Sequence, residues 1–129
     1  MSGFVLDASA LLALLLGEPG AERVASVLHG ATMSTVNLAE VVGHYTKQGA
    51  GAADIRLMLS GLPLSIAPFD EEMAYQVGFM RPAGEKVGLS LGDRACLILA
   101  RERKMPALSA DHAWTKIANE CGVEVELIR

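Results

Sequence analysis

The sequence predicts an α/β fold with three layers, in which a central parallel sheet is flanked by helices on both faces. Short apolar segments that are typical of buried strands alternate along the chain with longer segments of helical periodicity. The composition agrees with two covered faces, because 51% of the 129 residues are hydrophobic and the mean hydropathy is +0.33. A surplus of apolar surface for a protein partner would explain the same composition.

The predicted strands are short apolar runs, of which the first, with Phe4, Val5 and Leu6, ends at the carboxylate of Asp7. The strands are expected at Gly3–Leu6, Ala31–Ser34, Ser65–Pro68, Ala107–Ser109 and Val123–Leu127. The helices are expected at Ala10–Leu16, Ala21–Leu28, Leu38–Gln48, Ala52–Leu59, Glu71–Met80, Leu91–Arg103 and Ala113–Glu120. Pro82, Gly84 and Gly88 predict one substantial loop before the long helix.

Length and charge limit the classes of protein to consider. The sequence predicts a single domain over residues 1–129, and the net charge of −4 argues against a protein held on nucleic acid by bulk electrostatics. Cys96 and Cys121 have neither disulfide nor zinc spacing. The longest apolar run, Ala8–Leu16, is far shorter than the roughly 20 residues that span a bilayer, so we expect a cytoplasmic protein with no membrane partner.

Four acidic residues stand where predicted strands pass into helices: Asp7, Glu40, Asp93 and Asp111. Each is open to a local explanation, because Asp7 and Asp111 could be helix N-caps, and Asn37–Glu40 and Ser90–Asp93 have the spacing of a capping box. The carboxyl ends of parallel strands meet at one edge of a sheet, however. We therefore expect the four carboxylates to approach one another there.

Carboxylates that lie close together repel and raise one another's pKa, unless a cation sits among them. Oxygen ligands without a set of Cys or His side chains favour Mg²⁺ or Mn²⁺. Such ions activate water and stabilise charge on a phosphoryl group. The residues alone thus predict metal-dependent hydrolysis of a phosphodiester.

The order of these residues resembles that of a known family. Asp7–x–Ser9, Asn37–x–x–Glu40, the segment Leu89–Asp93 and the segment Ser109–Asp111 look like a PIN-domain ribonuclease. The segment LPLSIAPFDEE and the C-terminal sequence SADHAWTKIANECGVEVELIR look more narrowly like VapC toxins of type II toxin–antitoxin pairs. The resemblance extends over essentially the whole chain.

The resemblance implies an acidic pocket that binds Mg²⁺ or Mn²⁺ and cuts single-stranded regions of RNA. Asp7, Glu40, Asp93 and Asp111 match the acidic metal ligands and catalytic residues of the family, and Ser9 and Ser109 match hydroxyl positions beside them. The resemblance also implies a VapB-like antitoxin, whose C-terminal segment lies in an apolar groove, and a toxin homodimer.

Basic residues near Asp93 predict contacts to the substrate. Arg81, Lys86 and Arg94 could guide RNA phosphates toward the metal, although Arg94 is more simply explained by a pair with a neighbouring acid.

Three other functions remain to be weighed against the toxin. A PIN-fold module could bind RNA or protein without cleaving, or a nuclease of the same fold could process RNA outside any toxin–antitoxin pair. A phosphoacceptor receiver domain would share the alternating layout, but it needs an acid pair after the first strand, which the single Asp7 does not supply.

Overall fold

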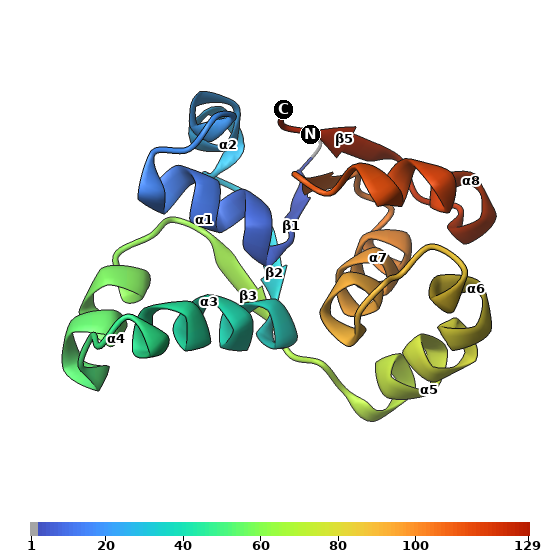
Figure 1. Ribbon diagram of the computed structural model, residues 1–129, viewed down its shortest axis with the longest axis horizontal. Helices are drawn as coiled ribbons and strands as arrows, with labels where there is room; N and C mark the ends of the chain where they lie inside the picture. The colour runs from blue at the N-terminus through green and yellow to red at the C-terminus, as the bar shows by residue number, and fades with distance from the viewer. Residues whose placement is uncertain (1–2) are drawn as a thin grey trace.

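A parallel sheet forms the centre of the structure, a computed structural model that describes residues 3–129 (Figure 1). Within this range the sheet has five strands in the order β3-β2-β1-β4-β5, and each strand pairs in parallel with its neighbours. The strands are β1 (Val5–Leu6), β2 (Thr32–Ser34), β3 (Ser65–Ala67), β4 (Ala107–Ser109) and β5 (Val125–Leu127). The predicted α/β class with a central parallel sheet is confirmed.

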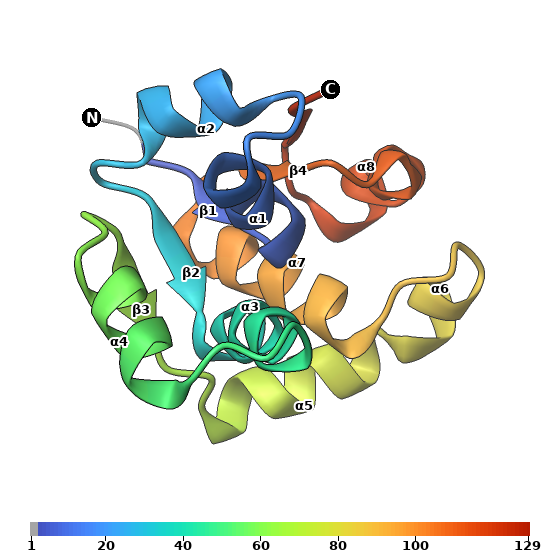
Figure 2. The same cartoon turned by 60° about the vertical axis from the view of Figure 1, so that its left-hand side comes forward.

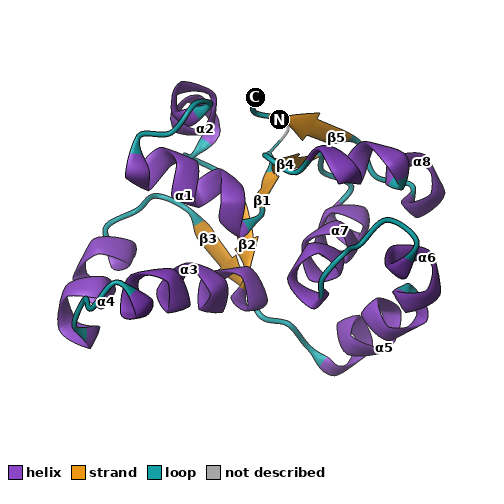
Figure 3. Ribbon diagram, viewed as in Figure 1, coloured by secondary structure: helices purple, strands orange, loops and turns teal. Residues whose placement is uncertain are grey.

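Helices cover both faces of this sheet (Figure 3). They are α1 (Ala8–Leu16), α2 (Ala21–Val27), α3 (Thr35–Lys47), α4 (Ala52–Ser60), α5 (Glu71–Phe79), α6 (Arg81–Glu85), α7 (Leu91–Arg103), the 3₁₀ helix η1 (His112–Lys116) and α8 (Ala118–Cys121). Figure 1 shows α1 and α7 on opposite sides of β1, and in the turned view of Figure 2 the start of α3 lies beside α7.

The two layers of core follow from the alternation of side chains along the strands. Val5 and Ala107 point to the face that α7 covers, where Trp114 is also fully buried. Leu6 and Leu108, one residue further along the same strands, point to the face that α1 and α2 cover. Since successive strand residues face opposite ways, two-residue and three-residue strands suffice to join both layers.

Helix α1 begins two residues earlier than predicted because Asp7 is its N-cap and accepts a hydrogen bond from the backbone N–H of Ala10. The helix ends at Gly17, whose φ of 69° is the left-handed conformation that glycine adopts without strain. The N-cap of α3 is Ser34, so this helix also begins earlier than the predicted Leu38.

Two predictions about the second half of the chain were wrong in detail. The expected loop around Pro82 contains α6, because proline is tolerated in the first turn of a helix. The single helix predicted at Ala113–Glu120 is divided into η1 and α8 at Ile117, whose φ of −119° departs from helical geometry.

The described residues include no helix that is both long enough and apolar enough to cross a bilayer. Cys96 and Cys121 are buried free thiols, as expected.

Arg94 joins α7 to α5 rather than to an acid. Its guanidinium donates to the backbone carbonyl of Val77 at 2.9 Å and to that of Ser90 at 3.3 Å, and its side chain lies against Gly84. The prediction that Arg94 pairs with a neighbouring carboxylate was therefore wrong. The carbonyl of Val77 lies in the last turn of α5, where carbonyl groups need a donor from outside the helix, and the guanidinium provides it; the carbonyl of Ser90 also accepts from the N–H of Arg94 at 3.1 Å.

Arg94→Met keeps most of the aliphatic stem but removes both hydrogen bonds. We expect the free energy of unfolding to fall by about 1–3 kcal/mol, since hydrogen bonds from a charged group are lost and the Val77 carbonyl loses this partner. Urea denaturation measures the change. Arg103→Met, at the exposed end of the same helix, is the control, and an equal effect of the two substitutions would contradict this role of Arg94.

Candidate active site

The carboxyl edge of the central strands collects the acidic residues. Asp7 follows β1 directly, and Asp111 follows β4, the parallel neighbour of β1. Glu40 lies in the second turn of α3, and Asp93 lies in the first turn of α7. The alternation of strands and helices thus brings residues far apart in the sequence to one edge of the sheet.

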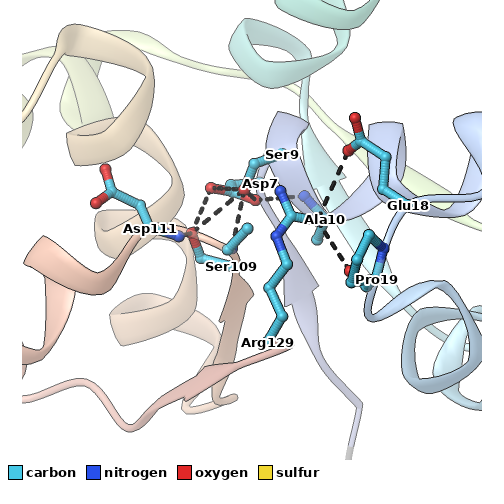
Figure 4. A network of polar contacts seen from close by, with 9 residues as sticks. Asp7, Ser9, Ala10, Glu18, Pro19, Ser109, Asp111 and Arg129 are labelled. Carbon is cyan, nitrogen blue, oxygen red and sulfur yellow. Dashed lines mark hydrogen bonds and ion pairs between the residues drawn. The ribbon is translucent and has the colours of Figure 1, made fainter.

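Asp7 is the buried member of this group, with only 4% of its surface exposed. Its carboxylate accepts hydrogen bonds from the hydroxyl of Ser109 at 2.6 Å, the hydroxyl of Ser9 at 2.7 Å and the N–H of Ala10 at 2.8 Å (Figure 4). The sequence-predicted residues Ser9 and Ser109 therefore both touch Asp7.

Backbone groups fix the direction of the two hydroxyls. The oxygen of Ser9 accepts from the N–H of Ala110, and the oxygen of Ser109 accepts from the N–H of Asp111, each at 3.0 Å. With a lone pair of each oxygen used in this way, each hydroxyl hydrogen is free to point at the Asp7 carboxylate. The segment after β4 therefore orients both serines, which hold Asp7 in one position.

Burial raises the pKa of Asp7 from 3.8 to about 6, in spite of these hydrogen bonds. The hydrogen bonds from Ser109, Ser9 and Ala10 favour the ionised form, and the negative charge of Asp93 disfavours it. The loss of hydration outweighs the donors. Ionisation of Asp7 is thus unfavourable in this position, and a nearby cation would make it less unfavourable.

Asp93 and Ser90 form the predicted capping box at the start of α7. The Ser90 hydroxyl accepts from the N–H of Asp93, and a carboxylate oxygen of Asp93 accepts from the N–H of Ser90 at 2.9 Å. One hydrogen bond leaves other lone pairs of the carboxylate available. Capping and ligand binding are therefore compatible at Asp93.

The capping box predicted for Asn37 and Glu40 is wrong, because Ser34 caps α3 and both residues lie inside the helix. Asn37 is buried, and its amide donates to a carboxylate oxygen of Glu40 at 2.8 Å and to the carbonyl of Gly92 at 3.1 Å. Glu40 itself is exposed.

Three of the four carboxylates converge near the buried thiol of Cys96 on α7. The pKa of this thiol is raised, first by burial and then by the negative charges of Asp7, Asp93 and Glu40. Each carboxylate comes from the start of a different helix. Cys96 was not predicted to have any relation to the site.

Asp111 lies at the edge of this group. One of its carboxylate oxygens caps η1 by accepting from the N–H of Ala113 at 2.9 Å, and its own N–H contacts Ser109. Figure 4 shows its carboxylate to one side of Asp7. The link from Asp111 to Asp7 thus runs through the hydroxyl of Ser109.

A metal ion at this site would be bound by the carboxylates and by water molecules together. In residues 3–129 no group of three or more Asp, Glu, His or Cys side chains is close enough, as placed, to enclose an ion. Mg²⁺ typically keeps several waters and needs only one or two carboxylates, so binding of Mg²⁺ does not require such an enclosure. The buried, oxygen-only donor at Asp7 and its neighbours Asp93 and Glu40 fit such an ion.

The basic residues predicted to bind substrate lie apart from these carboxylates in α6 and the turn after it. Arg81 is exposed and pairs with Glu85 at 2.8 Å, one helical turn away. Lys86 is exposed as well.

Asn37 and Gly92 are the contacts of Glu40 that sequence reasoning missed as parts of the site. Their signal in the sequence is spacing, since Asn37 lies three residues before Glu40 on one helix and Gly92 directly precedes Asp93.

Known structures with this fold include several complexes. Chains of DNA-bound VapBC from Salmonella typhimurium and of a toxin–antitoxin complex from Klebsiella pneumoniae match with TM-scores of 0.73 and 0.74. The first is 18% identical with full coverage of both chains, and the second is 16% identical with 98% coverage of each. A chain of FitAcB from Neisseria gonorrhoeae matches with a TM-score of 0.71, 23% identity and 97% coverage of each chain.

No curated protein sequence matches the chain. The PIN domain family matches residues 4–120, from the start of β1 through the site to α8. This match confirms the resemblance noted in the sequence: the chain belongs to the PIN domain family.

Proposed function

We propose that the protein is an Mg²⁺- or Mn²⁺-dependent endoribonuclease that cleaves single-stranded regions of RNA and acts as the toxin of a toxin–antitoxin pair. The observation that carries the proposal is the buried Asp7 carboxylate at the carboxyl edge of the sheet, which Ser9 and Ser109 hold by hydrogen bonds and which Ser109 links to Asp111. The PIN fold and its occurrence in VapBC structures support the same function.

In this proposal Asp7, Glu40 and Asp93 hold the metal, and Asp111 contributes from the edge of the site. When bound, the ion would activate water and stabilise charge on the phosphate. Ser9 and Ser109 keep the Asp7 carboxylate in place through hydrogen bonds of 2.7 and 2.6 Å. A ligand held in position before the ion arrives binds it with less loss of side-chain freedom.

Lys86 and Arg81 are proposed to meet RNA phosphates at the rim of the site. Both are exposed, and Arg81 can leave its partner Glu85 at little cost because that ion pair is open to solvent. Arg94 has no role toward RNA in this proposal, since carbonyl groups already occupy its guanidinium.

The partner is proposed to bind an apolar groove of about 570 Å³ between α1, α3, α4 and β3. Its apolar lining includes Leu38, Val42, Ile55, Leu59, Leu62 and Ile66. Ile66 remains 40% exposed although β3 is part of the sheet. A groove of this kind suits an apolar segment of an antitoxin similar to VapB.

We also propose a homodimer of the toxin.

The first test of this proposal is the cleavage of structured RNA with Mg²⁺ or Mn²⁺. Asp7→Asn and Asp93→Asn each remove one charged ligand but leave an amide oxygen that can cap a helix, and we expect each to slow cleavage by about a hundredfold or more. Asp54→Asn, in the first turn of α4, is the control. Cleavage by both site variants at the rate of the control would contradict the assignment of the active site, and no cleavage by the unaltered chain would favour a PIN-fold module that binds without cutting.

The second test combines pH and metal. Folding raises the pKa of Asp7 from 3.8 to about 6. As the pH rises from about 4 to about 6, the free energy of unfolding of the metal-free protein therefore falls by about 1.4 kcal/mol per pH unit. In the folded protein Asp7 stays protonated up to a pH of about 6, and the ionised form above this pH is the one that binds a cation. Mg²⁺ should therefore raise the melting temperature more at pH 7.5 than at pH 5.

Thermal melting with and without Mg²⁺ measures this difference, and Asp7→Asn should abolish most of it. An equal or larger effect of Mg²⁺ at pH 5 would contradict a carboxylate site.

The third test is co-purification with the product of the neighbouring gene. Ile66→Glu places a carboxylate in the groove and should weaken the complex roughly tenfold or more, because the charge would be buried without a partner. Leu57→Glu is the matched control, since Leu57 is 76% exposed on α4. If the unaltered chain does not co-purify with this product and is harmless when expressed alone, the better assignment is an RNA-processing nuclease outside any toxin–antitoxin pair.

A further inference from the structure

The carboxylate of Glu40 rests between two groups that come from different helices. On α3, Asn37 donates to it at 2.8 Å, and on α7, the Cα of Gly92 faces it directly. The same Asn37 amide donates to the carbonyl of Gly92 at 3.1 Å. An exposed glutamate has three rotatable side-chain bonds, so without these contacts its carboxylate would occupy many positions.

The orientation of the Asn37 amide is fixed by what surrounds it. Both of its partners, the Glu40 carboxylate and the Gly92 carbonyl, can only accept hydrogen bonds, so the NH₂ group must face them. The amide oxygen is consequently buried with no partner among the described residues. A buried acceptor without a donor destabilises a fold and needs an explanation. The explanation is that the amide group of Asn37 faces the other way, to hold the Glu40 carboxylate and the Gly92 carbonyl by two hydrogen bonds.

Gly92 needs an explanation of its own, because glycine in the first turn of a helix is less favourable than alanine. Its φ is not in the left-handed region, so the backbone does not require glycine here. A Cβ on residue 92 would instead overlap the Glu40 carboxylate, at 2.6 Å from its Cδ. The missing side chain therefore leaves the space in which this carboxylate lies.

We propose that Asn37 and Gly92 are positioning residues that together seat the Glu40 carboxylate beside Asp93. Gly92 leaves the space, and the Asn37 amide ties Glu40 to the turn of α7 that carries Asp93. The inference rests on the proposed metal-dependent function, since its purpose is to hold Glu40 ready for a cation that Asp93 and Asp7 also bind. Neither residue touches the substrate or the ion.

Mn²⁺ binding to the whole chain, measured by titration calorimetry, tests this role without relying on catalysis. Asn37→Leu and Gly92→Ala should each weaken Mn²⁺ affinity about tenfold or more, the usual effect of losing a group that orients a metal ligand. Gly92→Ala should fold at least as well as the unaltered chain, because only the end of a flexible glutamate must move. This variant keeps the test valid if Asn37→Leu folds poorly.

Two matched controls separate positioning from general damage. Asn119→Leu changes the only other asparagine of the chain, and Gly78→Ala adds a Cβ to a helical glycine with no neighbour within 4 Å. Both should bind Mn²⁺ as the unaltered chain does. In a Glu40→Gln background, Asn37→Leu and Gly92→Ala should cause no further loss of affinity, because the group that they position has lost its charge.

The outcomes are distinguishable from failure of the proposed function. If the unaltered chain neither binds Mn²⁺ nor cleaves RNA, the metal-dependent function is wrong, and the positioning role is overturned with it. If the unaltered chain binds Mn²⁺ and the Asn37 and Gly92 variants bind it equally well, only the positioning role is overturned. A loss of affinity that persists undiminished in the Glu40→Gln background would also overturn it, since the effect would not act through Glu40.

Discussion

Asp7 joins three parts of the structure at the carboxyl end of the central strand. Its carboxylate caps α1 through Ala10 and accepts the hydroxyls of Ser9 and Ser109, the second of which belongs to β4. The same burial that makes these bonds strong raises its pKa to about 6. The fold therefore keeps a carboxylate where its charge is unfavourable in the absence of a cation, and the negative charge of Asp93 increases this disadvantage. The serines offset part of the cost and keep the group in one orientation.

The strand order explains why acids distant in the sequence reach the same place. With β1 between β2 and β4, the segments that follow these strands all begin at one edge, and α7 packs across β1, β2 and β4 to bring its own first turn there. Helix starts also offer backbone N–H groups, so each acid can serve as a cap while it retains lone pairs for another ligand. Asp93 does both within one turn of α7. Capping and metal binding are alternatives in the sequence, but a capping carboxylate such as that of Asp93 keeps lone pairs that a cation could use.

The sequence predicted the alternation of strands and helices well, because apolar runs and local caps are properties of adjacent residues. It predicted the Ser90–Asp93 capping box for the same reason. The capping box predicted for Asn37 and Glu40 was wrong, because α3 begins directly after β2 and its N-cap is Ser34. The surroundings of Glu40 depend on Gly92, 52 positions further along the chain, and no local pattern contains that contact. The division between η1 and α8 likewise depends on how Trp114 and Ile117 fit against α7 rather than on helix propensity.

The apolar surplus of the sequence is distributed unequally over the molecule. Both residues of β1, Val5 and Leu6, are used in a core, so the central strand leaves no apolar surface over, whereas Ile66 of the edge strand β3 is 40% exposed. Part of the remainder lines the groove beside α3 and α4, where Arg56 is a charged side chain in an otherwise mostly apolar wall, and another part, Tyr75 and Phe79, lies exposed on α5. Helix α3 carries Glu40 near its start and Val42 in this groove two residues later, so the acidic site and the groove share one helix. A segment bound along the groove would thus lie within a helical turn or two of the acids, and a basic side chain on it could reach them.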